Sequence, residues 1–137
     1  MNRKKYLLDT NICIYWLRNR QDVEKRIDSV GLGNCAISEI TVAELKVGEV
    51  LGRKLGTKQR RDVSELLSKV EVIPISDAID FFAEEKVRLR LAGTPADDNF
   101  DLLIGCTSVV NGMVMVTQNV KDFKNIKGIQ IQNWIDG

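Results

Sequence analysis

The sequence predicts an α/β domain with a mainly parallel central sheet. Short apolar segments of strand length alternate with helical segments along the whole chain, which is typical of this class. Of the 137 residues, 44% are hydrophobic and 28% are charged, the usual balance of a globular domain. No internal repeat, low-complexity segment or linker interrupts the alternation. We therefore expect a single domain over residues 1–137.

The N-terminal half contains two predicted strands, each followed by helical segments. The first strand is a short apolar run that ends at Asp9, and the second ends at Ser38. Each helical segment places its apolar residues on one stripe, and Gly31 to Gly33 ends the second of them. The strands are predicted at 6–8 and 35–38, and the helices at 11–18, 22–30, 41–51 and 58–69.

The C-terminal half continues the same alternation. The segment 71–75 alternates and contains Pro74, so we expect a strand near an edge of the sheet. The residues from Met113 to Val116 form the strongest candidate for a central strand. A long helix is predicted at 77–91, an apolar and buried helix at 100–110, and a last short strand at 128–132.

Composition excludes several classes of protein. The chain has no histidine, which rules out histidine-based nucleases, Ser-His-Asp and Cys-His hydrolases, and imidazole metal sites. Its three cysteines are isolated, which favours a reducing cytoplasm. The N-terminal apolar run is too short for a signal peptide, and no run is long enough to span a membrane. The net charge of +1 neither requires nor excludes a nucleic-acid partner.

Acidic residues follow the predicted strands or begin the helices around them. Asp9 directly follows the first strand, Glu44 lies one turn into the helix after Ser38, and Asp101 begins the apolar helix. Ligands of open parallel sheets bind beyond the carboxyl ends of the strands, so these carboxylates can meet at one edge. Because close carboxylates repel one another, a hard divalent cation such as Mg²⁺ or Mn²⁺ would stabilise them. Such a site could activate a water for phosphodiester hydrolysis without histidine.

Each of these residues also has a purely structural explanation. Asp9 could cap a helix, and Thr41 with Glu44 matches a capping box. Asp101 could be an acid that favours the positive end of a helix dipole. Asn119 and Asp122 could simply shape a turn. The spacing of these residues alone does not decide between a metal site and these structural roles.

Four blocks of sequence resemble the PIN-domain family and, within it, the VapC-type toxins of toxin–antitoxin pairs. The blocks occur in the expected order and span nearly the whole chain. They read LLDTNICIYWL (7–17), ISEITVAELKVGE (37–49), LAGTPADDNFDLLIGCTSVVNGMVMVTQNVKDF (91–123) and IKGIQIQNWI (126–135). The resemblance implies a PIN-like domain with helices on both faces of the sheet. It also implies a Mg²⁺- or Mn²⁺-dependent endoribonuclease.

By this resemblance, Asp9, Glu44 and Asp101 are the catalytic acids and metal ligands. A fourth ligand is expected after the last central strand, where Asn119 stands at the comparable position and Asp122 could act through water. Asp98 is the rival of Asp101 for the third ligand. Side chains expected to orient the carboxylates are those of Thr10, Asn11 and Thr117. The chain has Gly105-Cys106 where the family commonly has two alanines, and these small residues should still allow close packing.

The resemblance further implies RNA as substrate, most often transfer RNA, with the initiator transfer RNA and ribosomal RNA among the family's targets. It implies a VapB-type antitoxin, a homodimer and a toxin–antitoxin hetero-oligomer. The basic residues nearest the predicted site in sequence are our candidates for RNA contact: Arg18, Arg20, Lys121 and Lys124. More distant candidates, each also explained as part of a solvated surface, are Arg53, Lys54, Lys58, Arg60, Arg61, Lys86, Arg88 and Arg90.

Two other classes remain as alternatives. A catalytically silent PIN-fold binding module would keep the fold without cleavage, although the intact acids favour activity. A Mg²⁺-binding receiver domain would need an acidic pair after the first strand, and only Asp9 stands there, beside Thr10. Nucleotide-binding folds of the Rossmann or P-loop type are excluded because their glycine motifs are absent.

Overall fold

The computed structural model describes residues 5–56 and 62–136, and its centre is a five-stranded sheet. All four strand pairings are parallel, which confirms the predicted α/β class and makes the sheet wholly rather than mainly parallel. The strand order is β3-β2-β1-β4-β5. The strands are β1 (Tyr6–Leu8), β2 (Cys35–Ser38), β3 (Glu71–Ile73), β4 (Val114–Val116) and β5 (Gln130–Gln132).

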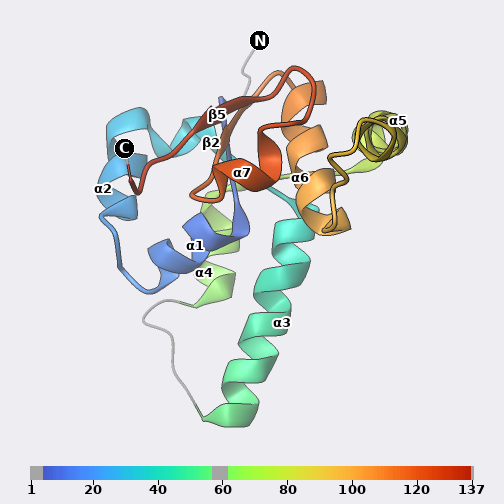
Figure 1. Cartoon of the computed structure of the whole chain (residues 1–137). Helices are drawn as coiled ribbons and strands as arrows, with labels where there is room; N and C mark the ends of the chain where they lie inside the picture. The colour runs from blue at the N-terminus through green and yellow to red at the C-terminus, as the bar shows by residue number, and fades with distance from the viewer. Residues whose placement is uncertain (1–4, 57–61, 137) are drawn as a thin grey trace.

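The strand order places the N-terminal strand β1 at the centre of the sheet, flanked by β2 and β4 (Figure 1). The strand predicted from Met113, β4, is internal, although β1 and not β4 is the middle strand. The strand β3 lies at an edge, as Pro74 predicts. Because all strands run the same way, their carboxyl ends meet at one edge of the sheet.

Helices connect the strands. They are α1 (Thr10–Leu17), α2 (Val23–Val30), α3 (Glu39–Leu55), α4 (Val63–Lys69), α5 (Ile79–Leu91), α6 (Asn99–Val110) and α7 (Val120–Phe123). Single 3-10 turns lie at Leu32–Asn34 and Ser76–Ala78. None of the helices in the described ranges is long and apolar enough to cross a membrane.

Helix boundaries differ from the prediction where a cap decides them. The helix predicted at 41–51 begins at Glu39, because the Ser38 side chain accepts a hydrogen bond from the Ile40 amide. In the region predicted as a helix at 58–69, α4 begins at Val63 behind the cap Asp62, and residues 57–61 lie outside the described residues. The helix predicted at 77–91 starts instead as a 3-10 turn. The short helix α7 was not predicted.

Side chains of the buried strands alternate between two apolar cores, one on each face. Tyr6 and Leu8 of β1 enter one core, together with side chains of α1, α2 and α4. Leu7 enters the other, where α5, α6 and α7 cover the sheet. This alternation of single residues along β1 confirms helices on both faces.

Helix α6 packs closely against the segment that follows α7. A methyl group at Gly105 would stand 2.4 Å from Ile126 Cδ1 and 3.1 Å from Phe123 Cδ1. The absence of a side chain at Gly105 therefore allows this approach. The small residue at 105 thus allows close packing as expected, although against Phe123 of α7 and Ile126 rather than against the sheet.

Helix α5 is tied to both segments beside it by polar side chains. Glu85, only 2% exposed, accepts hydrogen bonds from Arg88 at 2.7 Å and from the Lys127 amide at 2.8 Å. These contacts hold the pKa of Glu85 below its ordinary value, mainly through the Arg88 hydrogen bonds. Arg88 also donates to the Asn125 carbonyl, and Lys86 Nζ donates to the Ala96 carbonyl at 2.7 Å. Lys86 and Arg88, candidates for RNA contact by sequence, thus have structural partners.

We predict that Gly105→Ala destabilises the fold although alanine favours helices. The added methyl must displace Ile126 and Phe123, so the free energy of unfolding should fall by about 1–2 kcal/mol. The matched control is Gly48→Ala in α3, where a methyl meets nothing within 4 Å. The control should gain up to about 1 kcal/mol. Urea unfolding of both variants measures the difference, and equal effects would contradict the close packing at Gly105.

Candidate metal centre

Asp9 lies at the carboxyl end of the central strand and is 3% exposed. One carboxylate oxygen, Oδ1, accepts a hydrogen bond from the Thr10 amide at 2.8 Å, at the start of α1. The other, Oδ2, accepts one from Thr117 Oγ1 at 2.8 Å, just after β4. The Asp9 amide donates to the Val116 carbonyl. Asp9 therefore caps α1, in agreement with the structural explanation given above. The same hydrogen bonds hold its carboxylate between the ends of β1 and β4.

Glu44 reaches the same region from α3. Its Oε1 accepts a hydrogen bond from Thr10 Oγ1 at 2.6 Å, and Thr10 Oγ1 lies 3.0 Å from Thr41 Oγ1. The capping-box explanation of Thr41 and Glu44 is wrong, because Ser38 caps α3. Thr10 thus connects the start of α1 to α3, which is a positioning role of the kind expected for it. The contribution of Thr41 was not foreseen, since it depends on how α1 and α3 pack.

Asp101 lies in the first turn of α6, where Asp98 is the cap. Asp98 Oδ1 accepts hydrogen bonds from the amides of Phe100 at 2.9 Å and Asp101 at 3.2 Å. The Asp101 carboxylate receives no hydrogen bond from any residue that the structure describes. Of the two rivals, Asp98 caps α6 with its side chain, whereas Asp101 lies in the first turn, as its helix-dipole explanation requires, with no hydrogen bond to its carboxylate from the described residues.

The electrostatics show that these carboxylates share one environment. Burial raises the pKa of Asp9 to about 6, against the lowering effect of the bonds from Thr117 and Thr10, and the charges of Glu44 and Asp122 raise it further. Burial also raises the pKa of Asp101 to about 7, followed by the charges of Asp98, Asp9, Asp122 and Glu44. The structure therefore brings together the acids predicted from distant parts of the sequence.

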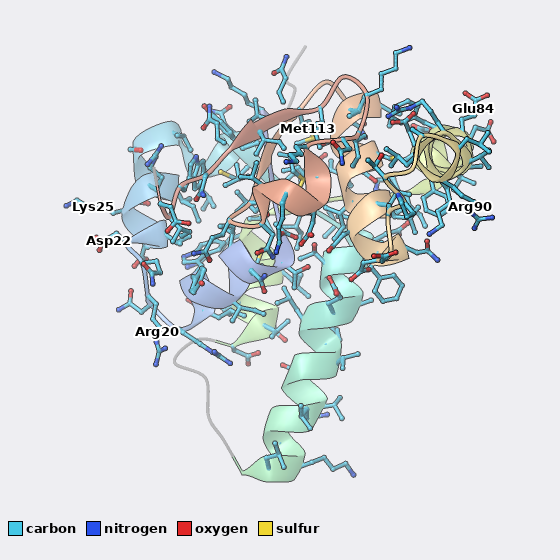
Figure 2. All side chains as sticks on the ribbon, viewed as in Figure 1. Arg20, Asp22, Lys25, Glu84, Arg90 and Met113 are labelled. Atoms are coloured by element: carbon cyan, nitrogen blue, oxygen red, sulfur yellow. The ribbon has the colours of Figure 1, made fainter. Side chains whose placement is uncertain are left out.

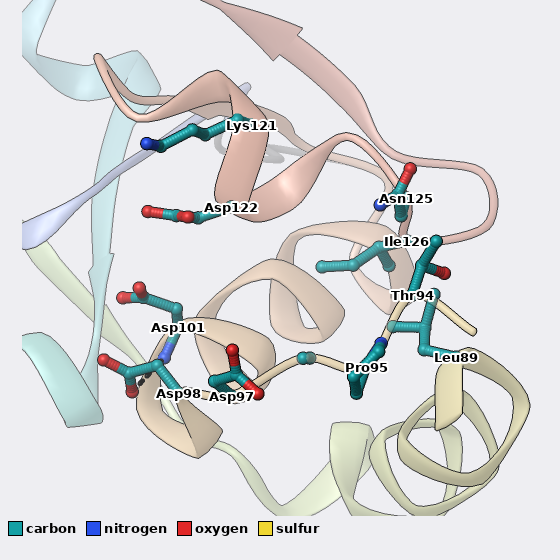
Figure 3. A pocket seen from close by; sticks show the side chains of 11 residues that line it. Leu89, Thr94, Pro95, Asp97, Asp98, Asp101, Lys121, Asp122, Asn125 and Ile126 are labelled. Atoms are coloured by element: carbon teal, nitrogen blue, oxygen red, sulfur yellow. Dashed lines mark hydrogen bonds between the residues drawn. The ribbon is translucent and has the colours of Figure 1, made fainter. Parts of the chain in front are cut away.

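The acids on α6 and α7 border an open pocket of about 250 Å³. In Figure 3 the side chains of Asp98, Asp101, Lys121 and Asp122 point into the same open space. Lys121 is the one of the four predicted RNA-contacting residues that lines it. The remaining wall consists of Leu89, Thr94, Pro95, Ala96, Asp97, Asn125 and Ile126.

Thr117 and Asn119 connect this pocket to Asp9. The Asn119 amide donates to Thr117 Oγ1 at 3.0 Å, and the same hydroxyl donates to Asp9. Asn119 stands at the cap position of α7, but its side chain makes no capping hydrogen bond. The choice between Asn119 and Asp122 as fourth ligand stays a prediction. Asp122 is the one whose charge acts on both Asp9 and Asp101.

Several residues that were predicted to orient the acids or to contact RNA lie away from the converging acids. Asn11 is exposed in the first turn of α1, and no hydrogen bond links its side chain to the described residues. Arg18 and Arg20 are exposed after the far end of α1, and Lys124 is exposed after α7. Arg53 and Lys54 lie in the last turn of α3, which projects away from the sheet (Figure 1). Arg90 is exposed on α5, and Lys58, Arg60 and Arg61 lie outside the described residues.

A network that sequence reasoning missed lies beside Thr117. Tyr15 donates to Gln118 Oε1 at 2.7 Å, and Gln118 Nε2 is 3.4 Å from Asp136 Oδ2. Side-chain hydrogen bonds thereby connect α1, the residue after Thr117 and the C-terminal turn. No local pattern signals such a contact between residues 103 positions apart.

The donor set fits a hard divalent cation. All the side chains that converge carry oxygen, and the charges of four neighbouring acids act on Asp101 without any hydrogen bond to its carboxylate from the described residues. Within the described ranges, no three Asp, Glu or Cys side chains are close enough together to enclose an ion. The acids are thus neighbours whose repulsion a cation would relieve, rather than a closed cage.

Comparison with known proteins agrees with this geometry. Residues 6–129 match the PIN domain family. The chain belongs to that family. It is 33% identical to Ribonuclease VapC2 of Rickettsia felis, over 94% of this chain and 97% of that protein. It is 30% identical to the tRNA(fMet)-specific endonuclease VapC of Salmonella typhimurium, over 95% of this chain and 98% of that protein. These relatives place this PIN domain among those of VapC type, as the sequence blocks predict.

Solved structures show the same relationship. DNA-bound VapBC from Salmonella typhimurium superposes with a TM-score of 0.80 at 29% identity, covering 95% of this chain and 98% of that one. VapBC2 from Rickettsia felis, bound to a promoter DNA fragment, gives 0.77 at 29% identity, covering 94% and 98%. The PIN-like architecture therefore extends over nearly the whole chain.

We predict that Asp101→Asn stabilises the metal-free protein at alkaline pH. Because the pKa of Asp101 rises from 3.8 to about 7 on folding, the folded protein holds its proton more tightly, and its stability falls as pH rises through that window. Asparagine removes both the cost of burying the charge and its repulsion by the neighbouring acids. Because Asp101 is only partly buried, we expect a gain of about 1 kcal/mol at pH 8 and almost none at pH 4.

Urea unfolding in chelator at both pH values measures this gain. The control Asp77→Asn alters an exposed carboxylate outside the acidic group and should change stability little. A loss of stability in Asp101→Asn at pH 8 would contradict the repulsion.

Proposed function

We propose that the protein is a Mg²⁺- or Mn²⁺-dependent endoribonuclease and the toxin of a VapBC-type pair. The observation that carries the proposal is the convergence of Asp9, Glu44 and Asp101 at the carboxyl edge of the sheet, where the charges of Asp9 and Glu44 contribute to the raised pKa of Asp101. The relatives named ribonuclease and endonuclease support the same activity. The chemistry of the site and the relationship to the family thus support the same function.

Asp9, Glu44 and Asp101 are the residues that would hold the metal, with Asn119 or Asp122 as a fourth. When bound, a divalent cation neutralises these acids, lowers the pKa of a water and balances charge that develops on a phosphate. Thr117 and the Thr10 amide fix both oxygens of Asp9, so its carboxylate is already oriented. Thr10 holds one oxygen of Glu44 in the same way. The chain therefore supplies orientation before any cation binds.

Lys121 gives this acidic site a positive charge at its entrance. It lines the pocket beside Asp122 and Asp101 (Figure 3), where it can attract a phosphate that the carboxylates would repel. We propose a structured RNA as the substrate, with transfer RNA as the first candidate, because two relatives are named tRNA(fMet)-specific. The three cysteines are buried and form no disulfide, which supports action in a reducing cytoplasm.

We further propose that a VapB-type antitoxin binds the protein and that the toxin forms homodimers within a hetero-oligomer. The solved relatives are VapBC assemblies, which supports the antitoxin. The projecting helix α3 exposes a stripe of apolar side chains that is typical of a protein interface: Val47, Val50, Leu51 and Leu55.

We predict that Asp9→Asn lowers RNA cleavage at least about a thousandfold, because it removes the charge of the most buried acid of the site. Antitoxin-free protein is incubated with total transfer RNA in Mg²⁺, Mn²⁺ or chelator, and new 5′ ends are mapped. Cleavage by the unsubstituted protein should require the metal.

The matched control is Asp28→Asn, an exposed carboxylate on α2, which should cut at the unsubstituted rate. Melting curves establish that each variant is folded. Equal cleavage by Asp9→Asn and the control would remove Asp9 from the mechanism. No cleavage by folded, antitoxin-free protein with either metal would favour the binding-module alternative.

A further inference from the structure

A second pocket, of about 490 Å³, lies on the α2 side of the molecule. It is formed between the start of α2 and the C-terminal turn after β5. Its lining combines two cations, one carboxylate, an indole, two uncharged polar side chains and an isoleucine: Gln21, Asp22, Lys25, Arg26, Ser29, Trp134 and Ile135. Its size is in the range of pockets that hold a small molecule or one unit of a polymer.

Arg26 is held in a defined orientation on the wall of this pocket. Its guanidinium lies over the Trp134 ring, 5.5 Å from the ring centroid. Asp22 stands four residues earlier on the same helix, yet no ion pair between the two is formed. The cation–π contact therefore fixes an exposed arginine, which reduces the entropy that a ligand contact would cost.

Trp134 supports Arg26 from below and is not itself available to a ligand. It is 6% exposed, its edge packs on Tyr6 at 5.5 Å between ring centroids, and its Nε1 donates to Gln132 Oε1 at 3.0 Å. The accessible planar surface in the pocket is thus the outer face of the guanidinium. RNA-binding proteins stack unpaired bases on such arginine planes.

Lys25 adds a charge next to this surface. It is exposed, lines the same pocket and projects outward from α2 in Figure 2. Ser29 donates its hydroxyl proton to the Arg26 carbonyl at 2.8 Å, so its oxygen is left as an acceptor. A planar cation, a mobile cation and a hydroxyl acceptor match the base, the phosphate and the 2′-hydroxyl of one ribonucleotide.

The pocket lies on a different side of the sheet from the acidic pocket. Trp134 belongs to the core beneath α1, α2 and α4, whereas α6 and α7, which border the acidic pocket, cover the other face. A nucleotide bound here would therefore belong to a part of the substrate away from the bond that is cut.

We propose that this pocket binds one unpaired nucleotide of the RNA substrate, with its base stacked on Arg26 and its phosphate near Lys25. The proposal rests on the ribonuclease function proposed above. It assigns to the α2 side a contribution to substrate binding rather than to the chemical step.

The test compares Arg26→Met with Lys69→Met. Methionine keeps an apolar stem over Trp134 while removing the planar charge. Lys69 is an exposed cation on α4 that pairs with Glu65 and does not line the pocket. Binding of a short, fluorescein-labelled single-stranded RNA is measured in chelator by anisotropy. We expect Arg26→Met to weaken binding about tenfold and Lys69→Met to change it less than about twofold.

Two further variants separate the roles. Arg26→Lys keeps the charge but not the plane, so it should recover only part of the loss. Lys25→Ala should reduce the salt dependence of binding by about one phosphate contact. With transfer RNA as substrate, Arg26→Met should raise KM and leave kcat unchanged.

The outcomes distinguish this proposal from the one on which it rests. If the protein binds and cuts RNA but Arg26→Met and Lys69→Met behave alike, the proposed nucleotide pocket is wrong and the nuclease function stands. A fall in kcat with unchanged KM would also overturn it. If the protein neither binds nor cuts RNA, both proposals fail.

Discussion

The buried carboxylate of Asp9 is the constraint on which the site depends. A charge at 3% exposure is costly unless hydrogen bonds satisfy it, and here the Thr10 amide and the Thr117 hydroxyl do so. These two donors lie after β1 and after β4, so the carboxylate joins two adjacent strand ends. The parallel arrangement of the sheet is what makes both donors available at one edge. The orientation of the Asp9 carboxylate therefore depends directly on the parallel arrangement of β1 and β4.

Around Asp9, hydrogen bonds orient the carboxylates of the site, although the negative charges of these carboxylates repel one another. The side chains that orient the acids are threonines, which donate hydrogen bonds without adding charge. The acids themselves come from different elements, and burial together with the charges of neighbouring acids raises the pKa of Asp9 and of Asp101. If the proposed metal binds here, this repulsion between acids is the cost in stability of a site for a cation, a common compromise at functional sites. It would explain why Asp101, whose carboxylate accepts no hydrogen bond from the described residues, stays at the start of α6.

The sequence predicts the elements well where their hydrophobic pattern is strong. All five strands were predicted within two residues, because short apolar runs between helices have few other interpretations. The helix α7 was missed since four residues show no helical period. The acidic residues of the site were predicted from their positions near the ends of the predicted strands and from the resemblance to the PIN-domain family. The contact of Thr10 with Glu44 could not be predicted, because it depends on how α1 packs against α3 and not on either segment alone.

The ties of α5 to its neighbours have a mechanical consequence. Lys86 holds the Ala96 carbonyl and Arg88 holds that of Asn125, and these two residues lie on opposite segments of the acidic pocket wall. A helix that supplies none of the acids thus couples both sides of that wall. Any widening of the pocket to admit a bulky RNA must either break these bonds or carry α5 along with it. The width of the pocket therefore depends on the position of α5. A substitution that shifts α5 could alter the pocket even if it lies far from the acids.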